Sequence, residues 1–234
     1  MRFVYLSLLA ATPILAVPTS AQTAEKDAPT LKKGERIVFL GDSITQAGVG
    51  RIGYVTLIKN RLAEKHKDLE IEVIGAGISG NKVPDLQKRL EKDVIAKKPT
   101  LVVIYIGIND VWHGEKDPAR GTSKDKFEAG LTEIIRKIKE AGARVVLCTP
   151  SVIGEKKAGM NTLDRQLDEY AAISRNVAKE TGAQLCDLRK AFVEHLEKNN
   201  PDDNEKGILT GDRVHLNEAG NKLVSEKILA VIDP

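Results

Sequence analysis

Short runs of apolar residues recur along the chain after residue 34, and each run is bounded by glycine or polar residues. The runs cover residues 36–40, 71–74, 101–106, 144–148 and 184–186. They are continuous rather than alternating, which is typical of strands that are buried on both faces of a sheet. The pattern therefore predicts five buried strands.

The segments between these strands carry apolar residues at helical spacing. In the clearest case the apolar residues lie four, three and four positions apart, at Phe127, Leu131, Ile134 and Ile138. Thr122 or Ser123 can cap the start of this helix, and Gly142 can stop it. A second helix with the same pattern is predicted over residues 163–177, before Gly182.

Strands that alternate with helices predict an α/β fold, here a three-layer α/β/α sandwich around a five-stranded parallel sheet. A last helix, which begins at the cap residue Asn217, completes a single domain over residues 34–234. In such sheets, ligands bind beyond the carboxyl ends of the strands. The loops that matter therefore begin at Gly41, Gly75, Gly107, Thr149 and Asp187.

The N-terminus has the pattern of a signal peptide. Residues 3–17 are nearly all apolar, but they are fewer than the ~20 residues that a membrane-spanning helix needs. Small residues at Thr19 and Ala21 permit cleavage after Ala21. We therefore expect a signal peptide over residues 1–21, a polar linker over 22–33, and an exported protein, periplasmic or extracellular, without stable membrane insertion after cleavage. An uncleaved anchor is the alternative.

The composition excludes several classes of protein. Hydrophobic residues make up 41% and charged residues 29% of the 234 residues, which is typical of a globular protein. The net charge of +3 is too small for a dedicated nucleic-acid binder. Two cysteines cannot form a disulfide framework or a cysteine zinc site. Cys148 and Cys186 end neighbouring predicted strands, so we expect two buried free thiols, with a disulfide as the alternative. The oligomeric state is left open.

The first strand leads directly into the segment Gly41-Asp42-Ser43-Ile44-Thr45. A hydroxyl at this position lies where a ligand would first meet the sheet. Ser43 can also be an ordinary helix cap, because serine is common at strand-to-helix turns.

The second strand ends in a glycine pattern, Gly75-Ala76-Gly77-Ile78-Ser79-Gly80. Such a pattern can bind a dinucleotide, but that function needs an acidic residue at the end of the next strand. The next strand offers none before Asp110. The pattern is therefore interpreted either as a tight turn or as a place where backbone N–H groups approach a negative oxygen of a ligand.

Polar side chains follow the third strand and precede the last helix. Asn109 can donate an amide N–H, and Trp112 and His113 come shortly after it. Asp212 and His215 lie three positions apart in a predicted turn, where the carboxylate can orient the imidazole as a base. The other two histidines, His66 and His195, lie in charged segments and are expected to be solvated.

Taken in order, these segments resemble the SGNH hydrolase family, also called GDSL esterases or lipases. The resemblance runs from Arg36 to about Ile232 and rests on four blocks: Gly41-Asp42-Ser43-Ile44-Thr45, Gly77-Ile78-Ser79-Gly80, Gly107-Ile108-Asn109-Asp110 and Asp212-Arg213-Val214-His215. It implies a flavodoxin-like SGNH fold without metal or cofactor. One departure is Gly75, where family members often carry Asn.

The resemblance also implies the roles of the site residues. Ser43 would be the nucleophile, His215 the base and Asp212 the residue that orients His215. The Ser43 N–H, the Gly80 N–H and the Asn109 amide would form the oxyanion hole. On the same loops, Asp42, Trp112 and His113 are expected to contact the substrate.

The implied function is hydrolysis of a short acyl ester, most simply an acetyl group on a saccharide. The loops are short and polar, for example residues 114–117 and 154–157, whereas a long acyl chain needs an apolar channel. A lipid acyl hydrolase of the lysophospholipase or thioesterase type is the alternative within the family. Less favoured are a metal-dependent phosphoesterase, which needs more carboxylate and imidazole ligands than these loops offer, and a non-catalytic carbohydrate-binding protein.

Overall fold

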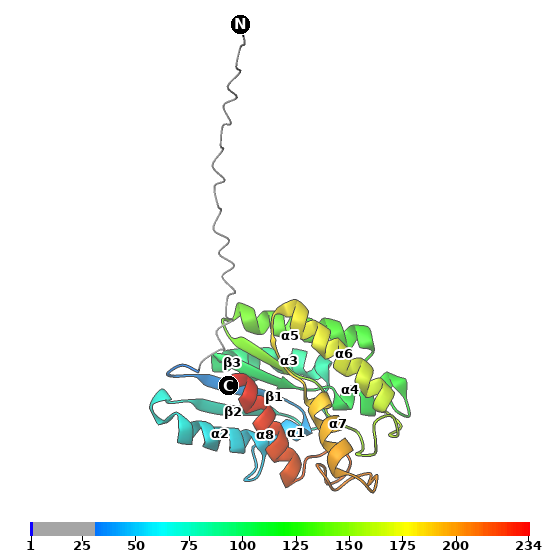
Figure 1. Ribbon diagram of the computed structural model, residues 1–234. Coiled ribbons are helices and arrows are strands. Elements are labelled where there is room, and N and C mark those ends of the chain that lie inside the picture. The colour runs from blue at the N-terminus through cyan, green and yellow to red at the C-terminus, as the bar shows by residue number, and fades with distance from the viewer. Residues whose placement is uncertain (2–30) are drawn as a thin grey trace.

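The fold is built around one five-stranded sheet. The computed structural model describes Met1 and residues 31–234. All strand pairs are parallel, in the order β2-β1-β3-β4-β5. The strands are β1 (Arg36–Gly41), β2 (Glu72–Gly77), β3 (Leu101–Tyr105), β4 (Arg144–Cys148) and β5 (Gln184–Cys186). The five-stranded parallel sheet predicted from the sequence is confirmed (Figure 1).

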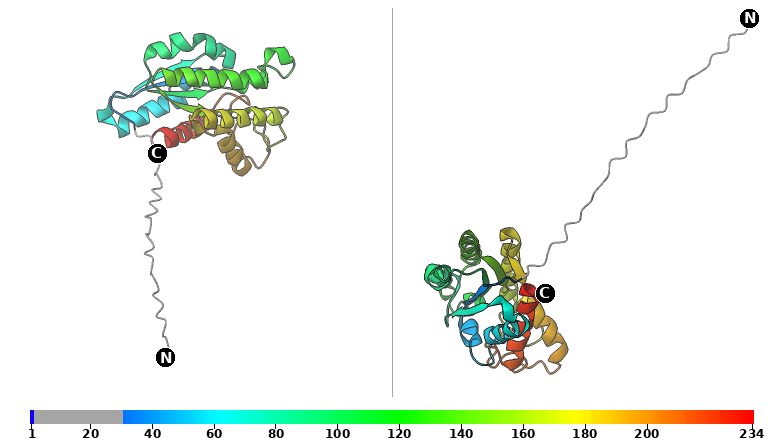
Figure 2. Two further views of the ribbon diagram at one scale, coloured as in Figure 1. Left: turned by 90° about the horizontal axis from the view of Figure 1, so that it is seen from above. Right: turned by 90° about the vertical axis from the view of Figure 1, so that its left-hand side faces the viewer.

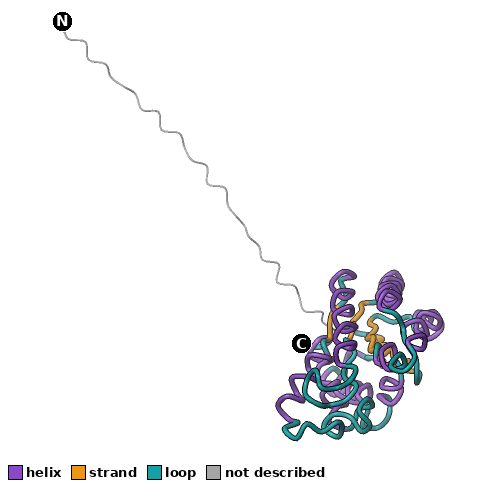
Figure 3. Tube along the Cα trace, turned by 90° about the vertical axis from the view of Figure 1, so that its right-hand side faces the viewer, coloured by secondary structure: helices purple, strands orange, loops and turns teal. Residues whose placement is uncertain are grey.

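Helices cover both faces of the sheet, which gives the three layers that were predicted (Figure 2). One face carries α2 (Tyr54–Lys65), α7 (Leu188–Asn199) and α8 (Glu218–Ile232), and the other carries α3 (Val83–Asp93), α5 (Lys124–Glu140) and α6 (Asp164–Thr181). Two short helices directly follow strands: α1 (Ser43–Gly48) and α4 (Ile108–Trp112). Three single 3₁₀ turns complete the elements: η1 (Lys67–Leu69), η2 (Ile95–Lys97) and η3 (Pro118–Arg120). Figure 3 shows the strands enclosed by helices, with loops crossing the side that faces the viewer.

The helices follow the apolar spacing in the sequence. In α5, the four residues that mark its apolar face, Phe127, Leu131, Ile134 and Ile138, are fully buried. Ser123 rather than Thr122 is the N-cap of α5, and its side chain makes no capping hydrogen bond. Gly182 ends α6 in the left-handed conformation, with φ of 65°, which glycine adopts without strain. The side chain of Asn217 caps α8 by accepting the Gly220 N–H.

The two edge strands differ from the prediction that all strands are buried on both faces. The central strands β1, β3 and β4 are almost entirely buried, whereas β2 is partly exposed along its length. The physical reason is the strand order, because β2 and β5 each have a neighbour on one side only. An apolar run alone does not distinguish an edge strand from a central one.

The folded domain begins slightly before the predicted boundary. Leu31, in the expected linker, is buried against the core, and the Lys32 N–H donates to the Glu35 carboxylate. The predicted signal peptide over residues 1–21 lies outside the described residues, apart from Met1, as does most of the linker. Within residues 31–234, no helix is both long enough and apolar enough to span a bilayer.

Two predictions about single residues have different outcomes. Cys148 and Cys186 are buried free thiols on paired positions of β4 and β5, as predicted. His66 is not freely solvated, because its Nε2 lies 2.9 Å from Asp233 Oδ1 and joins the end of α2 to the end of α8. His195 is half-buried on α7.

Candidate active site

Ser43 lies where β1 passes into α1. Asp42 is the N-cap of α1, and its carboxylate accepts the Ile44 N–H at 2.9 Å. The Ser43 hydroxyl therefore projects from the carboxyl end of a central strand. Its Oγ lies 2.9 Å from His215 Nε2, which is 172 positions away in the sequence.

The loop that carries His215 is closed at its base. Thr210 and Leu216 form an isolated antiparallel bridge, and the Gly211 N–H donates to the His215 carbonyl. Inside the loop, Asp212 Oδ1 accepts the N–H groups of Val214 and His215. Arg213, which lies between Asp212 and Val214, has φ of 85°. This conformation costs free energy for a non-glycine residue. This tight turn makes Asp212 and His215 face each other.

Asp212 and His215 form a direct hydrogen bond, with 2.7 Å between Oδ2 and Nδ1. Partial burial disfavours the charged carboxylate, but the hydrogen bonds from the ring and the backbone of His215 outweigh it. They hold the pKa of Asp212 below its usual range. A charged Asp212 fixes the proton on Nδ1, so Nε2 can accept the proton of the Ser43 hydroxyl.

The glycine pattern after β2 forms a turn next to Ser43. Gly77 pairs with Gly41, and a Cβ on Gly77 would lie 2.1 Å from the Gln46 nitrogen, so only glycine fits there. Gly80 has φ of 76° within a turn that the Asn81 N–H closes onto the Ile78 carbonyl. Within residues 31–234, the N–H groups of Ser43 and Gly80 donate to no acceptor.

The departure at Gly75 has a local explanation. The side chain of Val49 packs over this glycine, and a Cβ at position 75 would lie 2.3 Å from Val49 Cγ1. Glycine therefore makes room for the segment that follows α1.

Asn109 lies on the first turn of α4 and is buried. Its Nδ2 donates one N–H to the Asn81 carbonyl at 3.1 Å, which leaves the second amide N–H available. Because β3 is next to β1 in the sheet, the segments after β1, β2 and β3 meet at one end of the sheet. Of the proposed site residues, the structure thus pairs Ser43 with His215 and His215 with Asp212, and ties Asn109 to the glycine turn.

Trp112 and His113 stand at the end of α4, where both are half-buried. Their rings are 6.4 Å apart between centroids. Burial lowers the pKa of His113, and the positive charges of Lys82 and Arg120 lower it further. A neutral imidazole beside an indole can contact a polar, uncharged ligand.

Asp42 is placed differently from its predicted role. Its exposed fraction is 2%, and its carboxylate is engaged in capping α1. The expectation that Asp42 contacts the substrate is therefore replaced by a role in shaping the Ser43 turn. Among residues 31–234, no cluster of three or more His, Cys, Asp or Glu side chains has the arrangement of a metal site.

The comparisons with known proteins agree with this architecture. A family model described as GDSL-like lipase/acylhydrolase matches residues 39–223. The chain belongs to this family. It is therefore a carboxylic ester hydrolase, and the predicted family and enzyme class are confirmed.

Several relatives of this acylhydrolase are named esterases. An acetylxylan esterase from Geobacillus stearothermophilus is 34% identical over 85% of this chain and 94% of its own length. An isoamyl acetate-hydrolyzing esterase 1 homolog from Rattus norvegicus is 26% identical over 85% of this chain and 81% of its own. The crystal structure of an acetyl xylan esterase has a TM-score of 0.80 at 45% identity, and the match covers 83% of this chain and 98% of the other.

One residue that organises the site of this acylhydrolase has no signal in the sequence. Glu155 is fully buried, and its carboxylate accepts the backbone N–H groups of Ile208, Leu209 and Thr210. The Gly154 N–H donates to the Arg213 carbonyl at 2.8 Å. The segment after β4 therefore holds the loop that carries His215.

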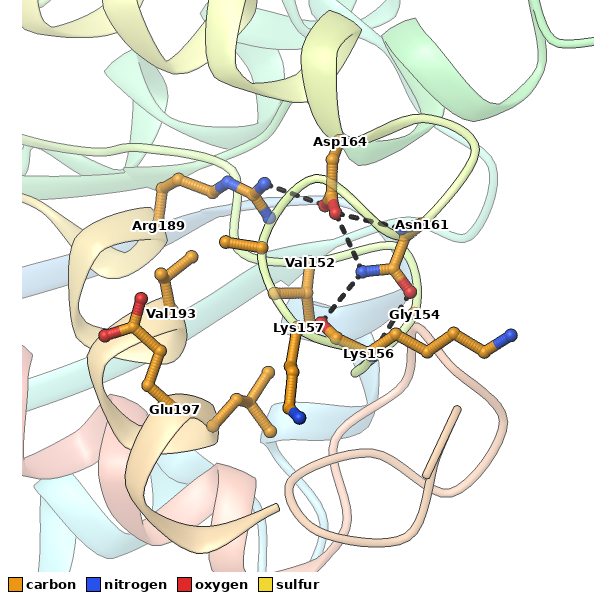
Figure 4. A pocket seen from close by; sticks show the side chains of 11 residues that line it. Val152, Gly154, Lys156, Lys157, Asn161, Asp164, Arg189, Val193 and Glu197 are labelled. Atoms are coloured by element: carbon orange, nitrogen blue, oxygen red, sulfur yellow. Dashed lines mark hydrogen bonds and ion pairs between the residues drawn. The ribbon is translucent and has the colours of Figure 1, made fainter. Parts of the chain in front are cut away.

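That segment is in turn supported by a buried ion pair beside a small cavity (Figure 4). Arg189 at the start of α7 donates to Asp164 at the start of α6, at 2.8 Å. Asp164 also accepts the backbone and side-chain N–H groups of Asn161. Neither Ser43 nor His215 lines this cavity. A buried pair of this kind is costly to break, so we interpret it as a structural support rather than as a binding site.

The burial of Asp42 leads to a prediction about stability. Burial raises the pKa of Asp42 to about 7, and the negative charge of Asp110 adds to the effect. The folded pKa then exceeds the usual value of 3.8, so ionisation of Asp42 opposes folding. This cost is fully present above the folded pKa and disappears as the pH falls below the unfolded one.

The variant Asp42→Asn is therefore expected to raise the melting temperature at about pH 8 and to change it much less at about pH 4. Asparagine keeps a side-chain oxygen for the Ile44 N–H. Melting curves at both pH values test this, with the exposed Asp125→Asn as the control. A gain in melting temperature that is larger at the lower pH would contradict a cost of ionising the buried Asp42 carboxyl.

Proposed function

We propose that this protein is an acetyl esterase that acts on carbohydrate esters, with Ser43 as its nucleophile. The single observation that carries the proposal is the chain of contacts from Ser43 Oγ through His215 to the Asp212 carboxylate, at 2.9 and 2.7 Å. A serine hydroxyl is a weak nucleophile until an adjacent base removes its proton. This geometry supports His215 as that base and Asp212 as the group that orients it.

In the proposed reaction, Ser43 Oγ attacks the ester carbonyl carbon while His215 Nε2 takes the hydroxyl proton. The tetrahedral intermediate collapses, His215 gives the proton to the leaving alcohol, and acetyl remains on Ser43. Water then attacks the acyl-enzyme with His215 again as the base, which releases acetate. Each proton that His215 accepts is returned, so Ser43 and His215 end the cycle unchanged.

The negative charge that develops on the carbonyl oxygen must be stabilised by hydrogen-bond donors. We assign this role to the N–H groups of Ser43 and Gly80 and to the second amide N–H of Asn109. The proposal is supported by the free N–H groups and by the position of all three segments at one end of the sheet. Neutral donors fixed in place stabilise an oxyanion strongly, because they do not have to reorient during the reaction.

The substrate assignment rests on chemistry and on relatives. Two related esterases have names that refer to acetylated xylan. Polar segments made of glycine, glutamate, lysine and aspartate lie beyond α4 and β4, at residues 114–117 and 154–157, which favours a polar alcohol over a long acyl chain. The expected place of action remains the periplasm or the extracellular space.

A panel of aryl esters with increasing acyl length, together with acetylated xylo-oligosaccharides, tests the substrate class. We expect kcat/KM to be highest for acetyl and to fall steeply with longer acyl chains, with release of acetate from the oligosaccharides. Highest activity on long acyl chains or on lysophospholipids would instead identify a lipid acyl hydrolase. Loss of activity in EDTA would point to the metal-dependent alternative.

The variant Asn109→Ala tests the oxyanion role. Removal of one donor typically lowers kcat by ~10²–10³-fold. KM should change little, because the neutral carbonyl of the bound ester needs this donor less than the oxyanion does. The measurement is kcat and KM on an aryl acetate with a melting curve beside it. A lower melting temperature with an unchanged kcat would show that Asn109 only shapes the turn at α4.

A further inference from the structure

Arg89 on α3 contacts two of the segments that form the proposed oxyanion hole: the end of β1, and the segment that runs from β2 through the Gly80 turn. Its Nη2 donates to the Gly41 carbonyl at 2.8 Å, and its Nη1 donates to the Ala76 carbonyl at 2.9 Å. Its Nε donates to Asn81 Oδ1 at 2.7 Å. Nη1 also reaches the Asp93 carboxylate at 3.2 Å. The guanidinium therefore makes three contacts outside α3 and one within its own helix.

Each contact outside α3 lies near a proposed oxyanion donor. Gly41 ends β1 two residues before Ser43. Ala76 and Asn81 stand on either side of the turn that contains Gly80. Asn81 also accepts the Asn109 amide through its carbonyl. A single side chain thus connects the backbone at Ser43, both ends of the Gly80 turn and, through Asn81, the amide of Asn109.

The side chain of Arg89 is 12% exposed, and its position on α3 is fixed by the neighbouring buried residues Leu86 and Leu90. The planar guanidinium has five N–H groups in a rigid fork. Four of them are used here, and three of these donate to acceptors outside α3: the Gly41 and Ala76 carbonyls and Asn81 Oδ1. A lysine at the same position has a single nitrogen and cannot reproduce this pattern.

From these contacts we infer that Arg89 is a positioning residue that sets the distances between the donors of the oxyanion hole. It does not touch the substrate; it acts through Gly41, Ala76 and Asn81. The inference rests on the proposed function, because it assigns a purpose to contacts around the proposed hole. Oxyanion stabilisation depends on donors held at ~2.7–3.1 Å from the oxygen, so a shift of the Gly80 turn weakens the transition state more than the bound substrate.

The test compares four variants on an aryl acetate: Arg89→Ala, Arg89→Lys, Asp93→Asn and Ser43→Ala. Displacement of reacting groups by ~1 Å can lower the reaction rate by ~10²-fold. We therefore expect Arg89→Ala to lower kcat by ~10–100-fold with little change in KM. Arg89→Lys should also lower kcat, although it retains the charge. Asp93→Asn removes only the contact within α3 and should leave kcat unchanged.

Two further readouts separate positioning from general destabilisation. Added guanidinium ion should restore part of the kcat of Arg89→Ala and should not affect Asp93→Asn. A boronic acid, which forms a tetrahedral anion on a nucleophilic serine, should bind Arg89→Lys more weakly by a factor similar to the loss in kcat/KM. The Arg89→Lys variant keeps the test decisive if Arg89→Ala fails to fold.

The outcomes distinguish the inference from the function on which it rests. Ser43→Ala without activity, together with wild-type kcat and boronate affinity in Arg89→Lys, would overturn the inference and leave the proposed function intact. Activity that persists in Ser43→Ala would overturn the proposed function itself. A drop in melting temperature of Arg89→Lys with no change in kcat would likewise show that Arg89 is only structural.

Discussion

The variant Ser43→Ala is expected to have no measurable enzymatic ester hydrolysis and to fold normally. The side chain is small and partly exposed, and its Oγ interacts with His215, so its loss creates no large cavity. Loss of a nucleophile that acts together with its base lowers kcat by as much as ~10⁶-fold. The measurement is acetate release from an aryl acetate, with circular dichroism and a melting curve for the fold.

The matched control is Ser123→Ala. Ser123 is an exposed serine at the start of α5, and its side chain makes no capping hydrogen bond. The Ser123→Ala variant should have wild-type activity. Activity of Ser43→Ala near the wild-type rate would contradict the assignment of the nucleophile, whatever the substrate proves to be.

The variant Asp212→Asn is expected to lower kcat by more than ~100-fold. Asparagine keeps an oxygen for the backbone N–H groups of Val214 and His215, so the turn can persist. What it loses is the negative charge at Oδ2, which stabilises the imidazolium and fixes the proton on Nδ1. Because the charged Asp212 is stabilised in the fold, the variant should also lose some stability, and kcat measured on the folded enzyme is the decisive readout.

Asp202→Asn provides the comparison for this variant. Asp202 is an exposed carboxylate in the loop after α7, and its loss should leave kcat unchanged. An Asp212→Asn enzyme with a wild-type rate would show that Asp212 serves only to shape the turn.

The sequence predicted the parts of the fold that depend on local pattern. Central strands such as β1 and β3 are continuous apolar runs, and α5 repeats its apolar positions at helical spacing. The exposure of β2 could not be predicted in this way, because it depends on which strand lies beside it. The position of Leu31 in the core has the same cause: a single apolar residue in a polar segment carries no periodicity.

The candidate site was predicted to the extent that its residues stand in recognisable blocks. Ser43, Asp212 and His215 were named from the sequence, and the structure brings them into contact. The burial of Asp42 was missed, because an acidic residue before a helix usually caps it while remaining exposed. Glu155 and Arg89 were missed for a different reason: they bind backbone groups that are distant in the sequence, and every residue type has such backbone groups, so the sequence does not reveal these partners.

Labelling with a serine-directed phosphonate tests directly whether Ser43 is the nucleophile. We expect one adduct per chain, located on Ser43 by peptide mass spectrometry, with loss of acetyl esterase activity in proportion to labelling. Labelling should become much slower in His215→Ala, because the base that activates Ser43 is removed. An adduct on another residue, or full activity in the labelled protein, would show that Ser43 is not the nucleophile.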